Sequence, residues 1–159
     1  MITVRRAAAH DATTVAQLIT AAFAEYRDRL VPPSGALREE AGAIASELTA
    51  PERLGFLAFD HADAAGCVMC KPEGGDLYFG RLAVVPERRG RGIARRLIDA
   101  VEGHARAHRY PAVVLAVRIA LPENQALFER YGYVEVSRYA HDGFDHPTSI
   151  RMRKALVQP

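Results

Sequence analysis

Residues 82–94, which read LAVVPERRGRGIA, decide the fold of this chain. An apolar run typical of a buried strand stops at Pro86, a basic turn containing Gly90 and Gly92 follows, and a long amphipathic segment begins at Ile93. This order predicts a strand, a loop and a helix, with several backbone N–H groups of the loop turned toward one point. Because these groups lie at the positive end of the helix dipole, the loop is predicted to bind an anion.

The glycines and arginines of this loop favour a pyrophosphate ligand. Gly90 and Gly92 have no Cβ, so they can adopt a positive φ and let a phosphate approach the main chain closely. The surrounding arginines can form charge-assisted hydrogen bonds with phosphate oxygens; they are Arg89, Arg91, Arg95 and Arg96. The alternative interpretation is a plain helix N-terminus with a solvated arginine face. A P-loop is excluded because the turn has no Gly-Lys-Ser/Thr ending, and the dinucleotide fingerprint Gly-x-Gly-x-x-Gly is absent from it.

The composition is that of a single globular domain, which we expect to span residues 1–159. Apolar residues make up 49% and charged residues 25% of the chain, and the formal net charge of +2 is too low for a wide nucleic-acid-binding face. No apolar run approaches the roughly 18 residues of a membrane span, and residues 1–5 follow a strand pattern rather than that of a signal peptide. We therefore expect a cytoplasmic protein with no nucleic-acid partner and no membrane partner.

The two cysteines, Cys67 and Cys70, form a C-x-x-C motif inside a segment that reads as a strand. On a strand, a spacing of three residues points the two side chains to opposite faces. One such pair also cannot supply the four ligands of a structural zinc site. We therefore expect neither a metal site nor a disulfide here.

The rest of the chain predicts elements in the order β-α-α-β-β-β-α-β-α-β-β. The expected strands cover residues 2–7, 54–60, 66–72, 77–85, 112–117, 133–139 and 149–155. The expected helices run from a cap at Asp11 to about Arg29, from Ser34 to about Thr49, from the glycine loop to about Arg109, and from Pro122 to Gly132. This order predicts an α/β fold with a mixed sheet.

Two motifs resemble those of the GNAT family of N-acetyltransferases. The spacing Arg89-x-x-Gly92-x-Ala94 is similar to the family's acetyl-CoA pyrophosphate loop, and PENQALFERYGY at residues 122–133 is similar to its short helix ending in Gly-aromatic. The resemblance extends over almost the whole chain. It implies a mixed, mostly antiparallel central sheet with splayed parallel strands and helices on both faces. It also implies acetyl-CoA as the cofactor, CoA as a product, and direct attack of a primary amine on the thioester in a ternary complex.

The resemblance further implies which residues bind the cofactor. The pantetheine arm would pair with the exposed main chain of Leu82, Ala83 and Val84, and an N–H such as that of Val84 would stabilise the oxyanion. The pyrophosphate would lie on the loop and first helical turn, which comprise Arg89, Gly90, Arg91, Gly92, Ile93, Ala94 and Arg95. From the short helix, Asn124 would bind the pantetheine arm and Phe128 would contact the cofactor. The alternative for Asn124 is an ordinary polar residue of a first helical turn.

Two features of the family pattern are missing. Gly80 and Arg81 stand where many members carry a carboxylate that acts as a base, and Phe128 replaces the tyrosine that is the usual general acid. Tyr131 is the candidate substitute for the acid, because it shares a helical stripe with Asn124. The alternative for Tyr131 is packing in the core.

The general base is open among three residues outside the usual strand position: Glu25, His141 and His146. We take His146 as the candidate catalytic residue, because residues 140–147 are rich in titratable groups and such a loop can flank the acceptor site. The alternative for this loop is a solvated hairpin. Tyr26 and residues 32–35 are expected to wall the acceptor pocket.

The expected acceptor is a primary amine of a small molecule or peptide. An alkyl ammonium with a pKa near 10.4 must lose a proton before it attacks, which costs about 4.6 kcal/mol at pH 7. The departures at Gly80 and Phe128 motivate an alternative, a catalytically silent CoA-binding sensor or interaction module of the same fold. The resemblance leaves a homodimer open.

Overall fold

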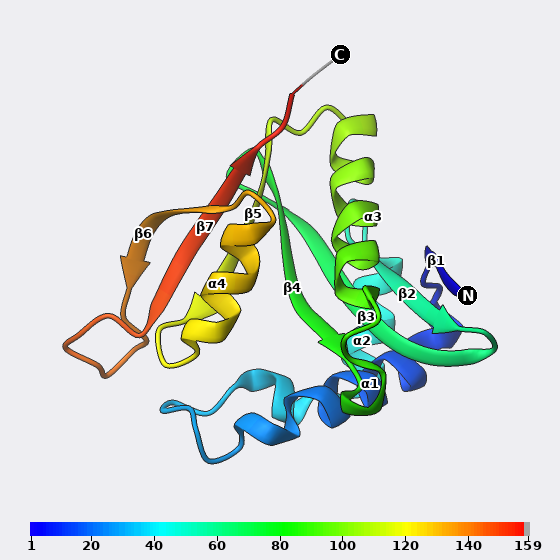
Figure 1. The fold of residues 1–159 in the computed structure, drawn as a ribbon, viewed down its shortest axis with the longest axis horizontal. Coiled ribbons are helices and arrows are strands. Elements are labelled where there is room, and N and C mark those ends of the chain that lie inside the picture. The colour runs from blue at the N-terminus through cyan, green and yellow to red at the C-terminus, as the bar shows by residue number, and fades with distance from the viewer. Residues whose placement is uncertain (158–159) are drawn as a thin grey trace.

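The computed structural model describes residues 1–157, in which seven strands form one sheet flanked by helices (Figure 1). The strands are β1 (Ile2–Arg6), β2 (Leu54–Asp60), β3 (Asp63–Glu73), β4 (Asp76–Val84), β5 (Ala112–Arg118), β6 (Val134–Tyr139) and β7 (Ser149–Ala155). The α-helices are α1 (Ala12–Phe23), α2 (Ala41–Thr49), α3 (Ile93–Ala107) and α4 (Pro122–Arg130). The predicted α/β class and the predicted order of elements are confirmed.

The strands lie in the order β1-β2-β3-β4-β5-β7-β6. Every neighbouring pair is antiparallel except β4 and β5, which are parallel and joined through the long crossover helix α3. The sheet is therefore mixed and mostly antiparallel, as expected.

Helices cover both faces of the sheet. One face packs against α3, with Leu97 and Val101 fully buried, and the other face packs against α1 and α2, with Ile19 and Ile44 fully buried. Cys70 lies in the first of these cores and Cys67 in the second, so the prediction that they face opposite sides of β3 is confirmed. Both thiols are free, and burial raises the pKa of each to about 12.

The parallel strands β4 and β5 pair over a short length only. Their register comprises Leu77 with Val113 and Tyr78 with Val114, although β4 continues to Val84. Figure 1 shows the two strands close at one end of the sheet and apart at the other. The far half of β4 therefore leaves one edge of its main chain without a strand partner, and backbone polar groups at such an edge need another partner.

A break in the β3–β4 register changes the direction of the side chains on β4. The register shifts between Cys67, paired with Ala83, and Met69, paired with Gly80, so β4 holds one extra residue there. Arg81 within this bulge has a φ of 51°. Before the bulge Phe79 packs in the α3-side core, and after it Ala83 packs on the opposite side. The bulge thereby turns Leu82 and Val84 toward the α3 face, since an extra residue reverses which face alternate side chains occupy.

Two helix boundaries differ by several residues from those predicted. The first helix ends at Phe23 and tightens into a 3₁₀ turn at Ala24–Tyr26, a common ending for α-helices. Ser34 caps a 3₁₀ helix at Gly35–Arg38, not the predicted long helix, which begins only at Ala41. The backbone between these two helices is extended at Glu39, whose carboxylate binds Arg81 of β4. A tertiary ion pair has therefore overridden the local helical pattern.

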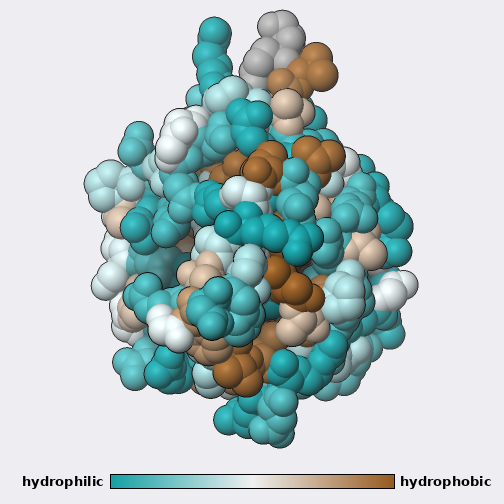
Figure 2. Space-filling view, turned by 90° about the vertical axis from the view of Figure 1, so that its left-hand side faces the viewer, coloured by the Kyte–Doolittle hydropathy of each residue, from teal (hydrophilic) through white to brown (hydrophobic). Residues whose placement is uncertain are grey.

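The edge strand β6 is exposed along its whole length. Its apolar residues Val134 and Val136 keep 61% and 54% of their surface in solvent. Figure 2, which views this side of the molecule, shows scattered apolar patches among polar side chains. Nothing in this structure tests the homodimer that the resemblance leaves open. Within residues 1–157, no helix combines the length and apolar character needed to cross a bilayer.

Candidate active site

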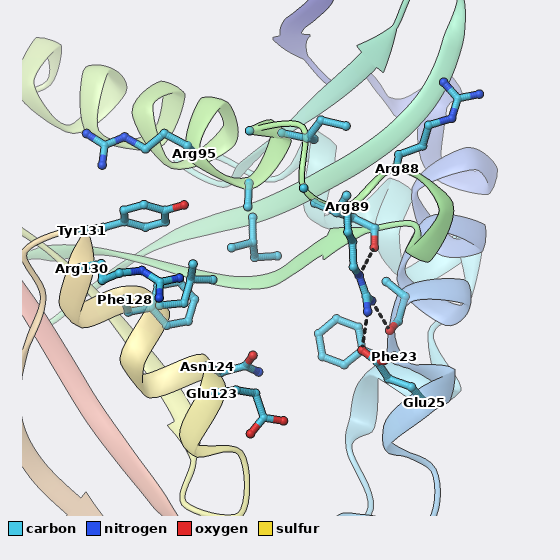
Figure 3. Close-up of a pocket in the computed structure, with 18 of the residues that line it drawn as sticks. Phe23, Glu25, Arg88, Arg89, Arg95, Glu123, Asn124, Phe128, Arg130 and Tyr131 are labelled. Carbon is cyan, nitrogen blue, oxygen red and sulfur yellow. Dashed lines mark hydrogen bonds and ion pairs between the residues drawn. The ribbon is translucent and has the colours of Figure 1, made fainter.

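A cavity of about 570 Å³ lies beside the end of β4 that has no β5 partner. Its walls come from the end of β4, the glycine loop, the first turn of α3, the end of α1 and one face of α4. Figure 3 shows the labelled side chains of α4 on one side of the cavity and Arg89 with Glu25 on the other. Most of the residues predicted to bind the cofactor line it: Leu82, Val84, Arg89, Gly90, Gly92, Ile93, Ala94, Arg95, Asn124 and Phe128.

The main chain of β4 presents polar groups to this cavity. The N–H of Val85 donates to Ala65 O of β3 at 3.0 Å, so the groups of the alternate residue Val84 face the opposite edge. In agreement with this, Val84 O accepts a hydrogen bond from Arg89 Nε at 3.2 Å. Ala83 is buried on the other face and does not line the cavity. The alternation that turns the groups of Val84 outward turns the N–H and C=O of Ala83 toward β3, so this geometry does not support the predicted contribution of Ala83.

The glycine loop adopts the predicted conformation. Gly90 and Gly92 both have a φ of 79°, and Gly92 precedes the first residue of α3. The first backbone bond of the helix runs from Arg96 N–H to Gly92 O at 3.1 Å, so the preceding amides have no acceptor within the helix. These amides are the ones for which the sequence predicted anion binding, and that binding stays a prediction.

Arg91 does not lie where it was expected. Its Nη1 donates to Asp60 Oδ2 at 2.7 Å, and Arg88 Nη1 donates to the same oxygen at 2.9 Å. Asp60 is buried at the end of β2. Burial raises the pKa of its carboxyl, but the hydrogen bonds from Arg88 and Arg91 outweigh this effect and leave the pKa below the usual value. Arg91 therefore ties the loop to the sheet and does not line the cavity.

Asn124 and Phe128 of α4 and Tyr131 at its C-terminal cap are among the residues that line the cavity. Asn124 contacts Tyr26, whose pKa is raised by burial and partly lowered again by this hydrogen bond. Tyr131 lies two turns farther along, with the Arg95 guanidinium 4.9 Å from the centre of its ring. It lines the cavity and also packs against the core, so the two interpretations of Tyr131 are compatible.

Phe128 fills the position of the missing tyrosine. Its ring meets those of Phe79 and Tyr133 edge to face, with centroids 5.9 and 6.3 Å away. The Tyr133 hydroxyl donates to buried Glu102, so this hydroxyl is held in the core by a hydrogen bond. Phe128 thus forms an apolar wall and cannot donate a proton.

The strand position of the missing base is occupied by other groups. A Cβ at Gly80 would lie 3.1 Å from the Tyr78 ring and hydroxyl, so the Tyr78 side chain fills the space beside Gly80. Arg81 turns the other way and binds Glu47 through two bonds of 2.9 and 2.6 Å and Glu39 at 3.1 Å. Neither residue can accept a proton from a substrate.

His146 does not lie at the site. It is exposed, its Nδ1 is 2.9 Å from Asp145 Oδ1, and it lines neither this cavity nor the neighbouring one. His141, from the same loop, lines a second cavity of about 240 Å³. Its backbone N–H donates to Thr148 Oγ1, and its Nδ1 contacts the same oxygen. Burial, followed by the nearby Arg118 charge, lowers the pKa of His141.

The two cavities meet at the point where β4 and β5 diverge. Phe23, Leu82, Asn124 and Phe128 line both of them. Ser34 of the predicted acceptor wall lines the second cavity, whereas Tyr26 lines the first. Sequence reasoning missed Tyr78 and Arg118 of the second cavity. A charged residue that ends an apolar strand is the signal that could have indicated Arg118, because strand ends in α/β sheets commonly supply site residues.

Comparison with known proteins agrees with this geometry. Residues 15–133 match the acetyltransferase (GNAT) family. The chain belongs to the GNAT family. The predicted resemblance is confirmed, and the matched range includes the glycine loop and all of α4.

Similar proteins include several acetyltransferases. A curated relative from Azospirillum brasilense, named IAA acetyltransferase, is 32% identical over 91 residues, which cover 57% of this chain and 59% of the relative. The ribosomal-protein-S18-alanine N-acetyltransferase of Escherichia coli shares the GNAT fold with a TM-score of 0.78 at 17% identity, over 100% of this chain and 96% of that one. The PaiA N-acetyltransferase of Thermoplasma acidophilum, solved with coenzyme A, has a TM-score of 0.78 at 16% identity, over 98% and 99% of the two chains.

Proposed function

We propose that this GNAT protein is an acetyl-CoA-dependent N-acetyltransferase that acts in the cytoplasm on a primary amine. The observation that carries the proposal is the pair of adjoining cavities that extends from the divergence of β4 and β5 to the amides at the start of α3. The name of the curated relative supports an acetyl-transfer activity.

The residues of the larger cavity fit acetyl-CoA. The outward edge of β4 at Val84 offers an N–H and a C=O to an amide-bearing arm, as a neighbouring strand would. The loop amides and the Arg89 and Arg95 guanidiniums suit a pyrophosphate. Asn124 adds an amide on the opposite wall. The volume of about 570 Å³ lies within the range of cofactor sites.

Bound acetyl-CoA would supply an acetyl thioester, which a neutral amine attacks directly while the thiolate leaves. The Val84 N–H is the main-chain donor that we assign to the oxyanion. The Tyr131 hydroxyl is the candidate proton donor for the thiolate, which needs only modest help because a thiol has a pKa near 8.5. His141 is the candidate base, since it lines the neighbouring cavity and its lowered pKa keeps it neutral near pH 7.

A second function, a silent CoA-binding module, is favoured by one observation. Gly80 has no side chain and Phe128 has no hydroxyl, so neither of the family's usual proton-transfer positions is functional. Such a protein would bind acetyl-CoA without releasing CoA in the presence of amines.

The first experiment is a thermal unfolding scan with acetyl-CoA, with adenosine as the control. At about 100 times Kd, binding stabilises the folded state by about 2.7 kcal/mol, which corresponds to roughly 5–10 °C in Tm. A shift with acetyl-CoA alone, followed by CoA release on adding amines, supports the enzyme. A shift without CoA release over a broad amine panel supports the silent module. The absence of a shift at millimolar acetyl-CoA would contradict both.

A further inference from the structure

The lining of the second cavity is basic. Its basic side chains are Arg81, Arg118 and His141, and no aspartate or glutamate of residues 1–157 lines it. Tyr78, Tyr139, Ser34 and Ser149 add hydroxyl groups. A pocket that selects a polycationic amine would be expected to carry carboxylates. The second cavity carries basic side chains instead.

Arg81 is already neutralised. Its guanidinium forms the bidentate pair with Glu47 and a further bond with Glu39, both of which lie outside the cavity lining. Two carboxylates around one guanidinium leave no positive charge to attract a ligand. Arg81 therefore shapes the cavity wall and does not bind an anion.

Arg118, by contrast, keeps its charge. Its Nη1 donates to Pro32 O at 2.7 Å and its Nη2 to Pro33 O at 3.3 Å, and both acceptors are neutral carbonyls. Among residues 1–157 it forms no ion pair, and the Tyr139 phenol is the acidic group that influences its pKa. The two carbonyls hold the planar group at the end of β5 while other N–H donors remain unused, because a guanidinium has five.

We infer that the acceptor is a small amine that carries a carboxylate, and that Arg118 binds this carboxylate. This inference rests on the proposed function. A half-buried arginine without a counter-ion, held on a cavity wall, suits a planar anion that accepts two parallel hydrogen bonds. The amine end then lies toward the junction formed by Leu82, Asn124 and Phe128. A volume of about 240 Å³ suits a molecule of amino-acid size rather than a long peptide.

The absence of carboxylates from the lining of the second cavity assists the reaction. No lining carboxylate of residues 1–157 stabilises the charged form of the acceptor's ammonium group, so the cavity does not oppose loss of the amine proton. This effect is useful in a protein that has Gly80 in place of the usual strand carboxylate. The carboxylate of the acceptor provides the binding energy that a cationic amine alone would lack here.

The test compares amino acids with their uncharged amides. For a panel of L-amino acids and the matching primary amides, we expect wild-type kcat/KM to be at least tenfold higher for the acids. Arg118→Gln should abolish this preference by lowering kcat/KM for acids 10- to 100-fold and leaving amides within about threefold. Arg118→Lys should retain part of the preference. Arg138→Gln on β6, which removes an exposed arginine that lines neither cavity, is the matched control.

A binding readout separates failure of this inference from failure of the proposed function. Isothermal titration of the CoA-loaded protein should detect the acids and not the amides, and Arg118→Gln should remove the acid signal even if no acetyl transfer occurs. Equal or better use of amides, or unchanged acid selectivity in Arg118→Gln, would overturn the inference while CoA release continues. Loss of CoA binding itself would overturn the proposed function.

Discussion

Arg89 and Glu25 form an ion pair on the wall of the larger cavity that faces α4, with Nη1 2.8 Å from Oε1 (Figure 3). The same guanidinium donates to Val84 O of β4 through Nε and to Ala22 O of α1 through Nη2, at 3.2 Å each. One side chain thus joins the glycine loop, β4 and the end of α1. Arg89 is therefore already held against the cavity wall, and little side-chain entropy remains to be lost on binding a pyrophosphate.

Replacing Arg89 should weaken acetyl-CoA binding more than replacing Arg91. Arg89→Gln removes a charged donor on the cavity wall, and we expect Kd for acetyl-CoA to rise about tenfold, or roughly 1.4 kcal/mol. Arg91→Gln removes a guanidinium that faces Asp60, so it should lower Tm while Kd changes less than threefold. Titration calorimetry gives both Kd values. If both variants lose the same affinity for acetyl-CoA, Arg91 belongs to the binding site.

Tyr131→Phe tests the proton donor. If the hydroxyl protonates the departing thiolate, kcat should fall about 10- to 100-fold while acetyl-CoA still raises Tm, because the ring and its contact with Arg95 remain. Steady-state kinetics of CoA release measure this effect. A kcat within twofold of wild type would leave Tyr131 with only a packing role.

His141→Gln tests the base through the pH profile. Burial and the Arg118 charge lower the pKa of His141 from 6.5, against an opposing effect of Asp142. A base must be deprotonated to act, so wild-type kcat/KM should fall only below about pH 6.5, when the imidazole becomes protonated. The variant should lose this acid limb and about 100-fold in rate at pH 7.5. If the variant keeps the acid limb of the pH profile, a group other than His141 causes that limb.

Asp11 should make the stability depend on pH in the acid range. Its carboxylate accepts bonds from Arg5 at 2.8 and 3.0 Å and from Ala8 N–H at 2.8 Å, and its pKa is lowered to about 2, mainly by Arg5. A lowered folded-state pKa stabilises the protein above the unfolded value of 3.8, and this contribution disappears as the pH falls toward 2.

Urea unfolding of Asp11→Asn measures this contribution. The variant should be about 1–2 kcal/mol less stable than wild type at pH 7, and the difference should shrink between pH 4 and pH 2. Glu135→Gln, which breaks the exposed pair with Arg138, should cost less than about 0.5 kcal/mol. A difference for Asp11→Asn that does not change with pH would point to packing instead of charge.

Local sequence signals predicted most elements of the fold correctly. The strand at residues 54–60 and the strand at 149–155 were predicted with their observed bounds, because alternation and flanking turn residues mark strands directly. The predicted start of the second helix was wrong. Glu39 pairs with Arg81, which lies 42 positions away, and such a distant contact leaves no trace in the local sequence pattern. The same reason explains Arg91, whose partner Asp60 lies on another strand.

The sequence by itself determined the glycine loop, since a positive φ at Gly90 and Gly92 and an amide-rich helix start are local properties of the backbone. It also determined the family, through motifs whose spacing is local. Only the tertiary structure decided which side chains share a cavity. The bulge at Arg81 turns Leu82 and Val84 toward the α3 face, and the divergence of β4 from β5 brings Arg118 and His141 near Asn124. These placements depend on strand register and on charges paired across the fold, which act through space rather than along the chain.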